Sequence, residues 1–148
     1  MESSVGRKRL PHHIPLDVRI GPEDEVFFIT ICCQPRGLNQ LARSTVWQAI
    51  DESLSFREHN GDLSVRLVLA MPDHLHGLFS FCGTKSMQKV ICDFKSWLAK
   101  SSEVHWQRDF FDHRLRGVES AAEKANYIRN NPVRAGLVHR PEEWPYQR

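Results

Sequence analysis

Three stretches of the chain have the hydrophobic pattern of β-strands. Residues 26–33 are apolar on both faces and rich in β-branched and aromatic side chains, which is typical of a strand buried on both sides. Residues 63–71 and 74–81 also have strand patterns, and only Pro72 and Asp73 separate them. The two later strands are therefore predicted to form a hairpin.

Two further stretches repeat their apolar positions at the spacing of an α-helix. Residues 41–58 and 85–100 each gather their large apolar side chains on one face. The second of these helices has lysines on the opposite face, among them Lys85, Lys89 and Lys95. Such a face is either an ordinary solvated surface or a track for a phosphate backbone, and the helical pattern alone does not distinguish the two.

A third helix is predicted for residues 121–130. Ser120 and Glu123 have the spacing of a capping box, and Pro132 requires the helix to end near Asn131. The apolar stripe of this helix consists of Ala121, Ala122, Ala125 and Ile128. Tyr127 and Asn131 are four residues apart on the other side, so Tyr127 is out of phase with the core and is expected to present its hydroxyl.

Alternation along residues 74–81 places His74 and His76 on the same face of their strand. Two imidazoles at this spacing can bind one divalent metal and leave coordination sites open, and the Asn131 amide oxygen would complete the set. The alternative is a pair of ordinary polar residues at a strand edge. Two other chemistries are excluded: a histidine-triad hydrolase needs a third alternating histidine where Leu78 stands, and a two-histidine phosphodiesterase needs a second motif that is absent.

Length and composition indicate one domain with a hydrophobic core, because 148 residues with 41% hydrophobic positions leave little room for two. No apolar stretch is long enough for a membrane span, and the first residues lack the apolar segment of a signal peptide. The four cysteines have no C-x-x-C spacing, so we expect reduced and mostly buried thiols.

The net charge of +2 is too small to indicate a nucleic-acid partner by itself, because 20 basic residues are nearly balanced by 18 acidic ones. The positive charge is unevenly distributed. A polar segment over residues 1–25 carries Arg7, Lys8 and Arg9 and is expected to be a basic arm. Basic residues also gather near the third helix.

Several motifs together resemble a known family, the small HUH tyrosine transposases of the IS200 type and, within it, the REP-associated branch. The motifs are residues 70–78 (AMPDHLHGL), 106–107 (WQ), 111–116 (FDHRLR) and 127–138 (YIRNNPVRAGLV). The two ends, residues 9–13 (RLPHH) and 144–146 (WPY), are also similar to the ends of family members. The resemblance covers nearly the whole chain, and residues 127–138 are its most specific part.

The resemblance implies a single α+β domain of the ferredoxin-like class, with an antiparallel sheet that presents the two histidines beside a helix bearing Tyr127. It implies a Mg²⁺ or Mn²⁺ ion held by His74, His76 and Asn131. It also implies that Tyr127 attacks single-stranded DNA next to a hairpin and forms a 5′-phosphotyrosine. A phenol is almost fully protonated at neutral pH and is a poor nucleophile. Tyr127 therefore needs help to lose its proton and a phosphate made more electrophilic, and the metal would supply at least the second.

Partners and location follow from the same resemblance. We expect hairpin-forming, REP-like single-stranded DNA as substrate, a monomer or homodimer, and a place in the bacterial cytoplasm at the nucleoid. Residues 139–148 are expected to form a C-terminal tail, of which residues 141–148 are expected to cover the site. The candidate DNA contacts are Arg7, Lys8, Arg9, Lys85, Lys89, Lys95, Arg114, Arg116, Arg129 and Arg134.

Two other functions stay open. A domesticated relative would bind hairpin DNA without cutting it. A ferredoxin-like RNA-binding module would read bases with aromatic side chains on its central strands. The second alternative leaves the paired histidines unexplained, and Phe27 and Phe28 lie in a stretch too apolar for an exposed platform.

Overall fold

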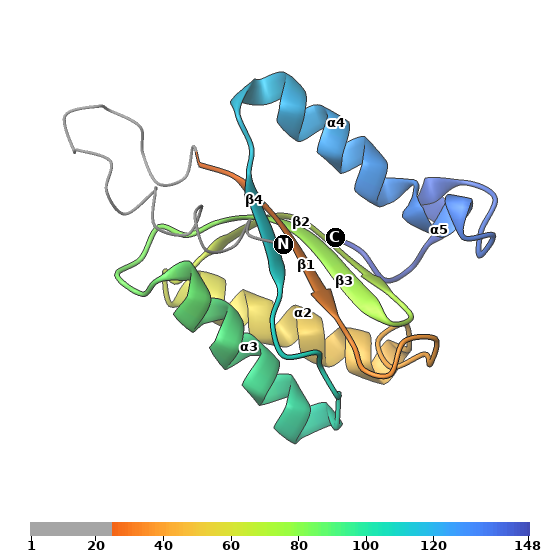
Figure 1. Cartoon of the computed structure of the whole chain (residues 1–148), viewed down its shortest axis with the longest axis horizontal. Helices are drawn as coiled ribbons and strands as arrows, with labels where there is room; N and C mark the ends of the chain where they lie inside the picture. Colours follow the sequence, from red (N-terminus) through yellow and green to blue (C-terminus); the bar gives the residue numbers. More distant parts are fainter. Residues whose placement is uncertain (1–24) are drawn as a thin grey trace.

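The computed structural model describes residues 25–148, which form an antiparallel sheet of four strands in the order β2-β3-β1-β4. The candidate DNA contacts Arg7, Lys8 and Arg9, and the predicted basic arm except Glu25, lie outside these residues. Figure 1 shows the sheet between two layers of helices. The strands are β1 (Phe27–Cys32), β2 (Ser64–Met71), β3 (His74–Ser80) and β4 (Phe111–Arg114).

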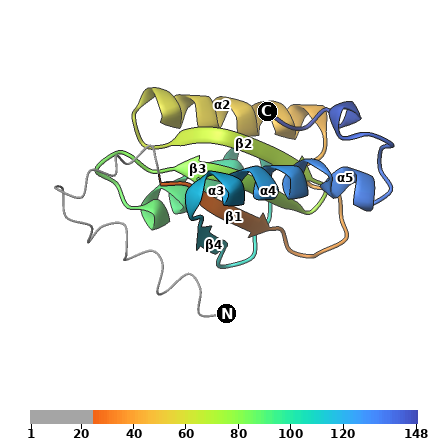
Figure 2. The same cartoon turned by 90° about the horizontal axis from the view of Figure 1, so that it is seen from above.

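Helices α2 (Ser44–His59) and α3 (Met87–Ser102) cover one face of the sheet, and α4 (Gly117–Arg129) lies over the other (Figures 1 and 2). A short helix, α5 (Asn131–Arg134), follows α4 directly. The first six elements in chain order, β1-α2-β2-β3-α3-β4, with β1 and β3 at the centre of the sheet, make the ferredoxin-like arrangement. The predicted fold class is therefore confirmed.

Strand β1 is buried on both sides, as its sequence predicted. Phe27, Ile29 and Ile31 point to the core beneath α2 and α3, whereas Phe28 packs into the second core beneath α4. The same division holds for β3, where Leu75 and Phe79 belong to the first core and Leu78 to the second. The histidines of β3 therefore share a face with Leu78, under α4.

A close packing contact explains the glycine between His76 and Leu78. The ring of Phe79 lies against the Cα of Gly77, at a point where a Cβ atom would overlap it. Phe79 is fully buried, so its ring has no room to move aside. Gly77 therefore allows this part of β3 to pack beneath the helices.

Strand β4 and the start of α4 differ from the sequence-based expectation. The four residues of β4 were not predicted as a strand, because the segment is short and has no clear alternation. Helix α4 begins at Gly117 with Arg116 as its N-cap, so the predicted capping box at Ser120 is wrong. Ala122 is exposed, whereas Ala121, Ala125 and Ile128 pack on the sheet.

The C-terminal residues pair with β2 at the edge of the sheet. Backbone hydrogen bonds join Val68 to Arg148 and Ala70 to Tyr146. Trp144 is buried beside them, and its indole nitrogen donates to the carbonyl oxygen of Ala70 at 3.0 Å. The expectation that the tail covers the site is therefore wrong: the segment extends the sheet instead.

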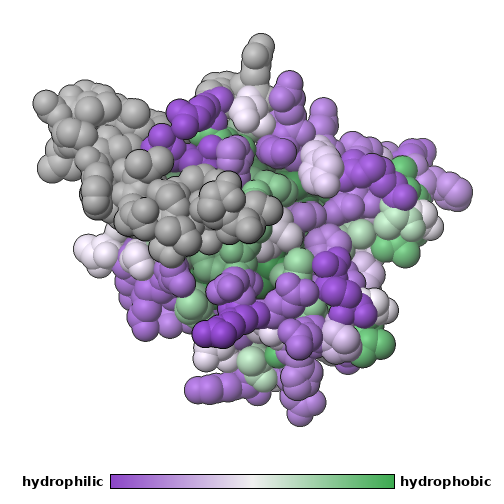
Figure 3. Space-filling view, viewed as in Figure 1, coloured by the Kyte–Doolittle hydropathy of each residue, from purple (hydrophilic) through white to green (hydrophobic). Residues whose placement is uncertain are grey.

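The surface and the cysteines complete the description. Cys33 is buried and Cys32 half-buried, but Cys82 and Cys92 are exposed, so the expectation of mostly buried thiols is wrong. All four are unpaired, as expected. Hydrophilic side chains dominate the face seen in Figure 3, with small apolar areas between them. Within residues 25–148, no helix is long and apolar enough to cross a membrane.

Candidate functional site

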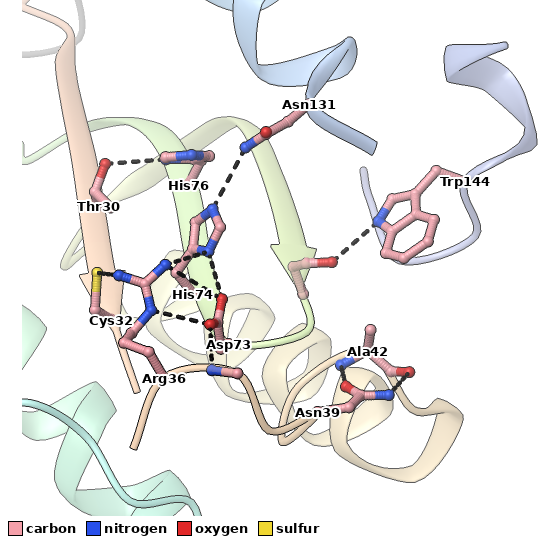
Figure 4. A network of polar contacts seen from close by, with 12 residues as sticks. Thr30, Cys32, Arg36, Asn39, Ala42, Asp73, His74, His76, Asn131 and Trp144 are labelled. Carbon is pink, nitrogen blue, oxygen red and sulfur yellow. Dashed lines mark hydrogen bonds and ion pairs between the residues drawn. The ribbon is translucent and has the colours of Figure 1, made fainter. Parts of the chain in front are cut away.

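The two histidines of β3 meet at the end of the sheet where the β2–β3 hairpin turns. The ring centroids of His74 and His76 lie 4.7 Å apart. Both rings come from alternate positions of one strand, which confirms the predicted common face. Figure 4 shows the two rings side by side above the turn.

Each histidine uses its Nδ1 atom for a contact within the protein. Nδ1 of His74 lies 2.9 Å from a carboxylate oxygen of Asp73, and Nδ1 of His76 lies 2.9 Å from the hydroxyl of Thr30 on β1 (Figure 4). A carboxylate can only accept, so Nδ1 of His74 carries a proton and its Nε2 points away from Asp73, toward α5. Contacts of this kind orient imidazoles that bind a metal through Nε2.

Asp73 is itself held by the loop after β1. Arg36 donates from Nε to Asp73 at 3.0 Å, and the backbone N–H of Gly37 donates to the same carboxylate at 2.8 Å. Burial alone would raise the pKa of Asp73, but the hydrogen bonds from Arg36, His74 and Gly37 outweigh it and hold that pKa well below its ordinary value. The carboxylate is therefore charged at every pH at which the protein is expected to work.

His76 lies deeper than His74, with 6% of its surface exposed. Its ring stacks on Phe28 at a centroid distance of 5.4 Å. Burial is the main cause that lowers the pKa of His76 to about 3, and the electrostatic effects of the neighbouring His74, Arg134 and Arg36 side chains act in the same direction. His76 is therefore neutral at pH 7, the form in which imidazole binds metals.

The end of α4 and the start of α5 bring two more residues to the histidines. The amide nitrogen of Asn131 lies 3.4 Å from Nε2 of His74 (Figure 4). The ring of Tyr127 lies 6.3 Å from that of His76 between centroids, and 48% of the Tyr127 surface is exposed. Ile128 anchors this part of α4 in the core, which turns Tyr127 to the accessible side of the helix.

Two cations flank the Tyr127 ring. The guanidinium carbon of Arg134 lies 4.3 Å from the ring centroid, and the ammonium of Lys124 lies 5.6 Å from it. Lys124 also lies 5.1 Å from the centroid of Phe28. The surroundings of the tyrosine are therefore positively charged, which suits an anionic substrate.

The donor set fits a divalent metal with two nitrogen ligands and one amide oxygen. Among residues 25–148, no group of three or more histidine, cysteine, aspartate or glutamate side chains is arranged to hold a metal. Asn131 offers an amide oxygen as a third protein ligand beside His74 and His76, and it is in reach if its side-chain oxygen turns toward the histidines. Water or substrate would occupy the remaining positions.

The other candidate DNA contacts are spread over the molecule. Arg116, directly before α4, and Arg129, at the end of α4, are both exposed. Arg114 forms an ion pair with Glu25 at 3.3 Å. Lys85 lies before α3, and Lys89 and Lys95 lie on it. This helix covers the face of the sheet opposite the histidines. Lys85 and Lys89 pair with Asp62 and Asp93. The ammonium of Lys95 donates to three backbone carbonyls of residues 107–109.

Four residues of the site were not predicted from the sequence: Thr30, Arg36, Asp73 and Lys124. Asp73 could have been found, because a carboxylate directly before a candidate metal-binding histidine is a signal in itself. Thr30 becomes visible only when β1 is placed beside β3, where it is the register partner of His76. The two cations gave no signal beyond their charge.

Comparison with curated proteins finds similar sequences in Haemophilus influenzae. No family model matches the chain. The chain is 42% identical over 96 residues to a Haemophilus influenzae protein named "Putative REP-associated tyrosine transposase", covering 53% of this chain and 54% of that protein. It is 30% identical over 91 residues to an "Uncharacterized protein" of the same organism, covering 43% and 51%. The chain thus spans about half the length of the curated relatives it matches.

A solved structure shares the fold. It is a REP-associated tyrosine transposase bound to a REP hairpin, and it matches with a TM-score of 0.75 at 19% identity over 87% of this chain and 79% of that one. The sequence match and the shared fold agree with the resemblance carried by residues 70–78 and 127–138. The chain is therefore similar to a REP-associated tyrosine transposase in sequence over about half its length, and to another in fold.

Proposed function

We propose that the chain is a metal-dependent tyrosine transposase that cuts and rejoins single-stranded DNA next to a hairpin. One observation carries the proposal: an accessible tyrosine on α4 stands beside two histidines on β3 whose Nδ1 atoms are both engaged. Separate elements, far apart in sequence, bring a nucleophile and a ligand pair together. Neither the fold nor the packing of the core requires an exposed tyrosine beside two oriented histidines.

The metal site of the proposal consists of His74, His76 and Asn131. When bound there, Mg²⁺ or Mn²⁺ supplies Lewis-acid polarisation of a phosphate oxygen. Asp73 and Thr30 keep the two imidazoles oriented, and the burial that lowers the pKa of His76 keeps that ring unprotonated. The chain thus holds both imidazoles in place, and His76 in its neutral form, before any substrate arrives.

The reaction of the proposal is a transesterification at Tyr127. Its hydroxyl oxygen attacks the phosphorus, the bond from phosphorus to the 3′-oxygen breaks, and the phenol proton is balanced by the proton that the 3′-oxygen gains. The product is a 5′-phosphotyrosine and a free 3′-hydroxyl. Attack by another 3′-hydroxyl reverses the step and joins two strands, so no nucleotide cofactor is consumed.

The proposed substrate is single-stranded DNA beside a hairpin. A structure with this fold was solved with a REP hairpin, and this chain places Arg134 and Lys124 beside Tyr127. A phosphate must approach the tyrosine from the accessible side of α4, and the backbone of an unpaired strand can bend to do so. Basic residues elsewhere, including Arg116 and Arg129, remain candidates for contacts to the hairpin.

The test uses hairpin-forming oligonucleotides from the gene's own flanks, labelled at the 3′ end in one set and the 5′ end in another. The 3′ label should migrate with the protein on a denaturing gel when Mn²⁺ is present, and the 5′ label should not. Chelator or Tyr127→Phe should abolish attachment while native-gel binding persists. If the wild type binds every hairpin offered and attaches to none, a hairpin-binding protein without strand cleavage is the better account.

A further inference from the structure

Lys124 lies about one helical turn before Tyr127 on α4, and its side chain extends toward the Tyr127 ring. Its ammonium stands 5.6 Å from the centroid of the Tyr127 ring and 5.1 Å from that of Phe28. Arg134 approaches the same tyrosine from α5, 4.3 Å from its centroid. Two cations from consecutive helices therefore converge on one aromatic ring.

Neither cation has an acidic partner among the side chains that the structure describes. The hydrogen bond of Arg134 goes to the backbone oxygen of Tyr127, at 2.8 Å, which anchors the guanidinium but leaves its charge uncompensated. Lys124 is half-buried, and its ammonium lies over the rings of Phe28 and Tyr127. Arg36, on the other side of the histidines, is by contrast neutralised by Asp73.

A partly buried ammonium without a counter-ion favours an anionic ligand. Contact with the face of a ring attracts a cation less strongly than a charge-assisted hydrogen bond to a phosphate oxygen does. The long stem of Lys124 allows the ammonium to turn from the rings to a phosphate placed beside Tyr127. Partial burial strengthens that interaction relative to the same contact in water.

We propose that Lys124 and Arg134 form a two-cation cradle that binds the scissile phosphate, with Lys124 as a further catalytic residue. The inference rests on the proposed function and adds to it the groups that hold the reacting phosphate on the tyrosine's side. When the bond from the tyrosine oxygen to phosphorus forms and the bond to the 3′-oxygen breaks, negative charge gathers on the non-bridging oxygens. Fixed positive charge at those oxygens stabilises that arrangement more than the bound ground state.

The test compares Lys124→Met, which keeps the apolar stem, with Lys124→Arg, which keeps the charge. Lys100→Ala, an exposed lysine on α3 across the sheet, is the matched control. Single-turnover attachment to a 3′-labelled flank hairpin is measured with saturating Mn²⁺, and affinity for the same oligonucleotide is measured with the Tyr127→Phe background. Lys124→Met should slow attachment on the order of 100-fold with less than about threefold loss of affinity.

A chemical substitution separates this role from a structural one. An oligonucleotide with a methylphosphonate at the scissile position lacks the negative charge that Lys124 is proposed to bind. On that substrate the attachment rates of Lys124→Met and the wild type should differ by less than about threefold. The lysine substitution and the methylphosphonate each remove the same interaction, so the second change adds little to the first. Lys124→Arg should recover most of the rate on the phosphate substrate. Equal losses on both substrates, or a loss no larger than that of Lys100→Ala, would overturn the proposal.

A second measurement tests whether the cradle binds phosphate, even if no covalent adduct forms. The chain has two tyrosines, so the ring signals of Tyr127 and Tyr146 are easily assigned in ¹³C-labelled protein. Titration with a 5′-phosphorylated trinucleotide should shift the Tyr127 signals in the wild type and not in Lys124→Met, with Tyr146 unchanged in both. If the wild type forms no adduct but shows this shift, the proposed function fails and the cradle stands. If Tyr127 does not respond, the cradle fails.

Discussion

The Asp73 carboxylate and Nδ1 of His74, neighbours in the chain, meet at 2.9 Å in the turn between β2 and β3. The contact fixes which nitrogen of His74 faces α5, where Asn131 approaches it. Because Arg36 and the Gly37 amide hold Asp73 in turn, the turn and the loop after β1 form one support for the ligand. The orientation of His74 is therefore set before a metal or DNA binds.

Asp73→Asn should weaken metal binding more than it weakens the fold. Loss of the charged acceptor lets the His74 ring turn or change tautomer, and outer contacts of this kind typically contribute about 10–100-fold to metal affinity. Mn²⁺ affinity measured by electron paramagnetic resonance should fall by that factor. Asp93→Asn, which removes an acidic group on α3 paired with Lys89, should leave it unchanged. Equal affinities for all three proteins would contradict the assigned role of Asp73.

Mn²⁺ should bind more tightly than Mg²⁺ at the same site. Two of the three proposed protein ligands are neutral imidazoles, whereas Mg²⁺ prefers oxygen ligands and usually at least one carboxylate. Competition of Mg²⁺ against bound Mn²⁺ should give a larger dissociation constant for Mg²⁺ than for Mn²⁺. His74→Ala and His76→Ala should each abolish Mn²⁺ binding. A site that prefers Mg²⁺, or that survives both substitutions, is a different site.

The metal-free protein should lose stability in mild acid because of His76. Burial lowers its folded pKa to about 3 from 6.5, so the unfolded chain binds one more proton than the folded protein between those values. The contribution is complete above about pH 6.5 and is lost progressively as the pH falls toward 3. At pH 4.5 the loss amounts to about 2–3 kcal/mol.

Urea unfolding in the presence of chelator measures this dependence. His76→Gln should flatten the decline in the free energy of unfolding between pH 6.5 and 4.5. His59→Gln, at an exposed position near the end of α2, should retain the wild-type slope. A wild-type stability that is constant across this range would contradict the buried, neutral state of His76.

Trp144→Ala should destabilise the protein without accelerating any reaction. The indole is buried against β2 and donates to Ala70, so its truncation leaves a cavity and an unpaired carbonyl, at a cost of about 3–5 kcal/mol. Deleting residues 144–148 should also expose the edge of β2 and promote association between molecules. Unfolding curves and light scattering test both expectations. A deletion variant that is stable but attaches to DNA faster would show that the tail obstructs the site after all.

The strands and helices that were predicted correctly have strong local patterns. The both-sided burial of β1 and the common face of His74 and His76 follow from side-chain alternation, which survives folding because the sheet pairs in register. By contrast, β4 has only four residues and exists because β1 offers them a free edge. The C-terminal pairing with β2 has the same origin. Such elements depend on a partner strand, so their own residues carry little signal.

The site divides in the same way. The histidine pair could be proposed from spacing alone, but about 50 residues separate it from Tyr127 and Asn131, and only the resemblance to a family brought the two halves together. Within the structure, Ile128 in the second core seats the helix that carries the tyrosine. Thr30 and Lys124 were missed because their roles come from proximity across elements. A threonine in a strand and a lysine on a helix are otherwise unremarkable.

Peptide mass spectrometry of the adduct decides whether Tyr127 becomes covalently bonded to DNA. The protein is incubated with a flank hairpin and Mn²⁺, the adduct is trimmed with nuclease, and the chain is digested with trypsin. We expect a nucleotide phosphate on the peptide of residues 125–129, which contains Tyr127. A remnant on Tyr146 or another residue, or DNA cut with no residue modified, would contradict it.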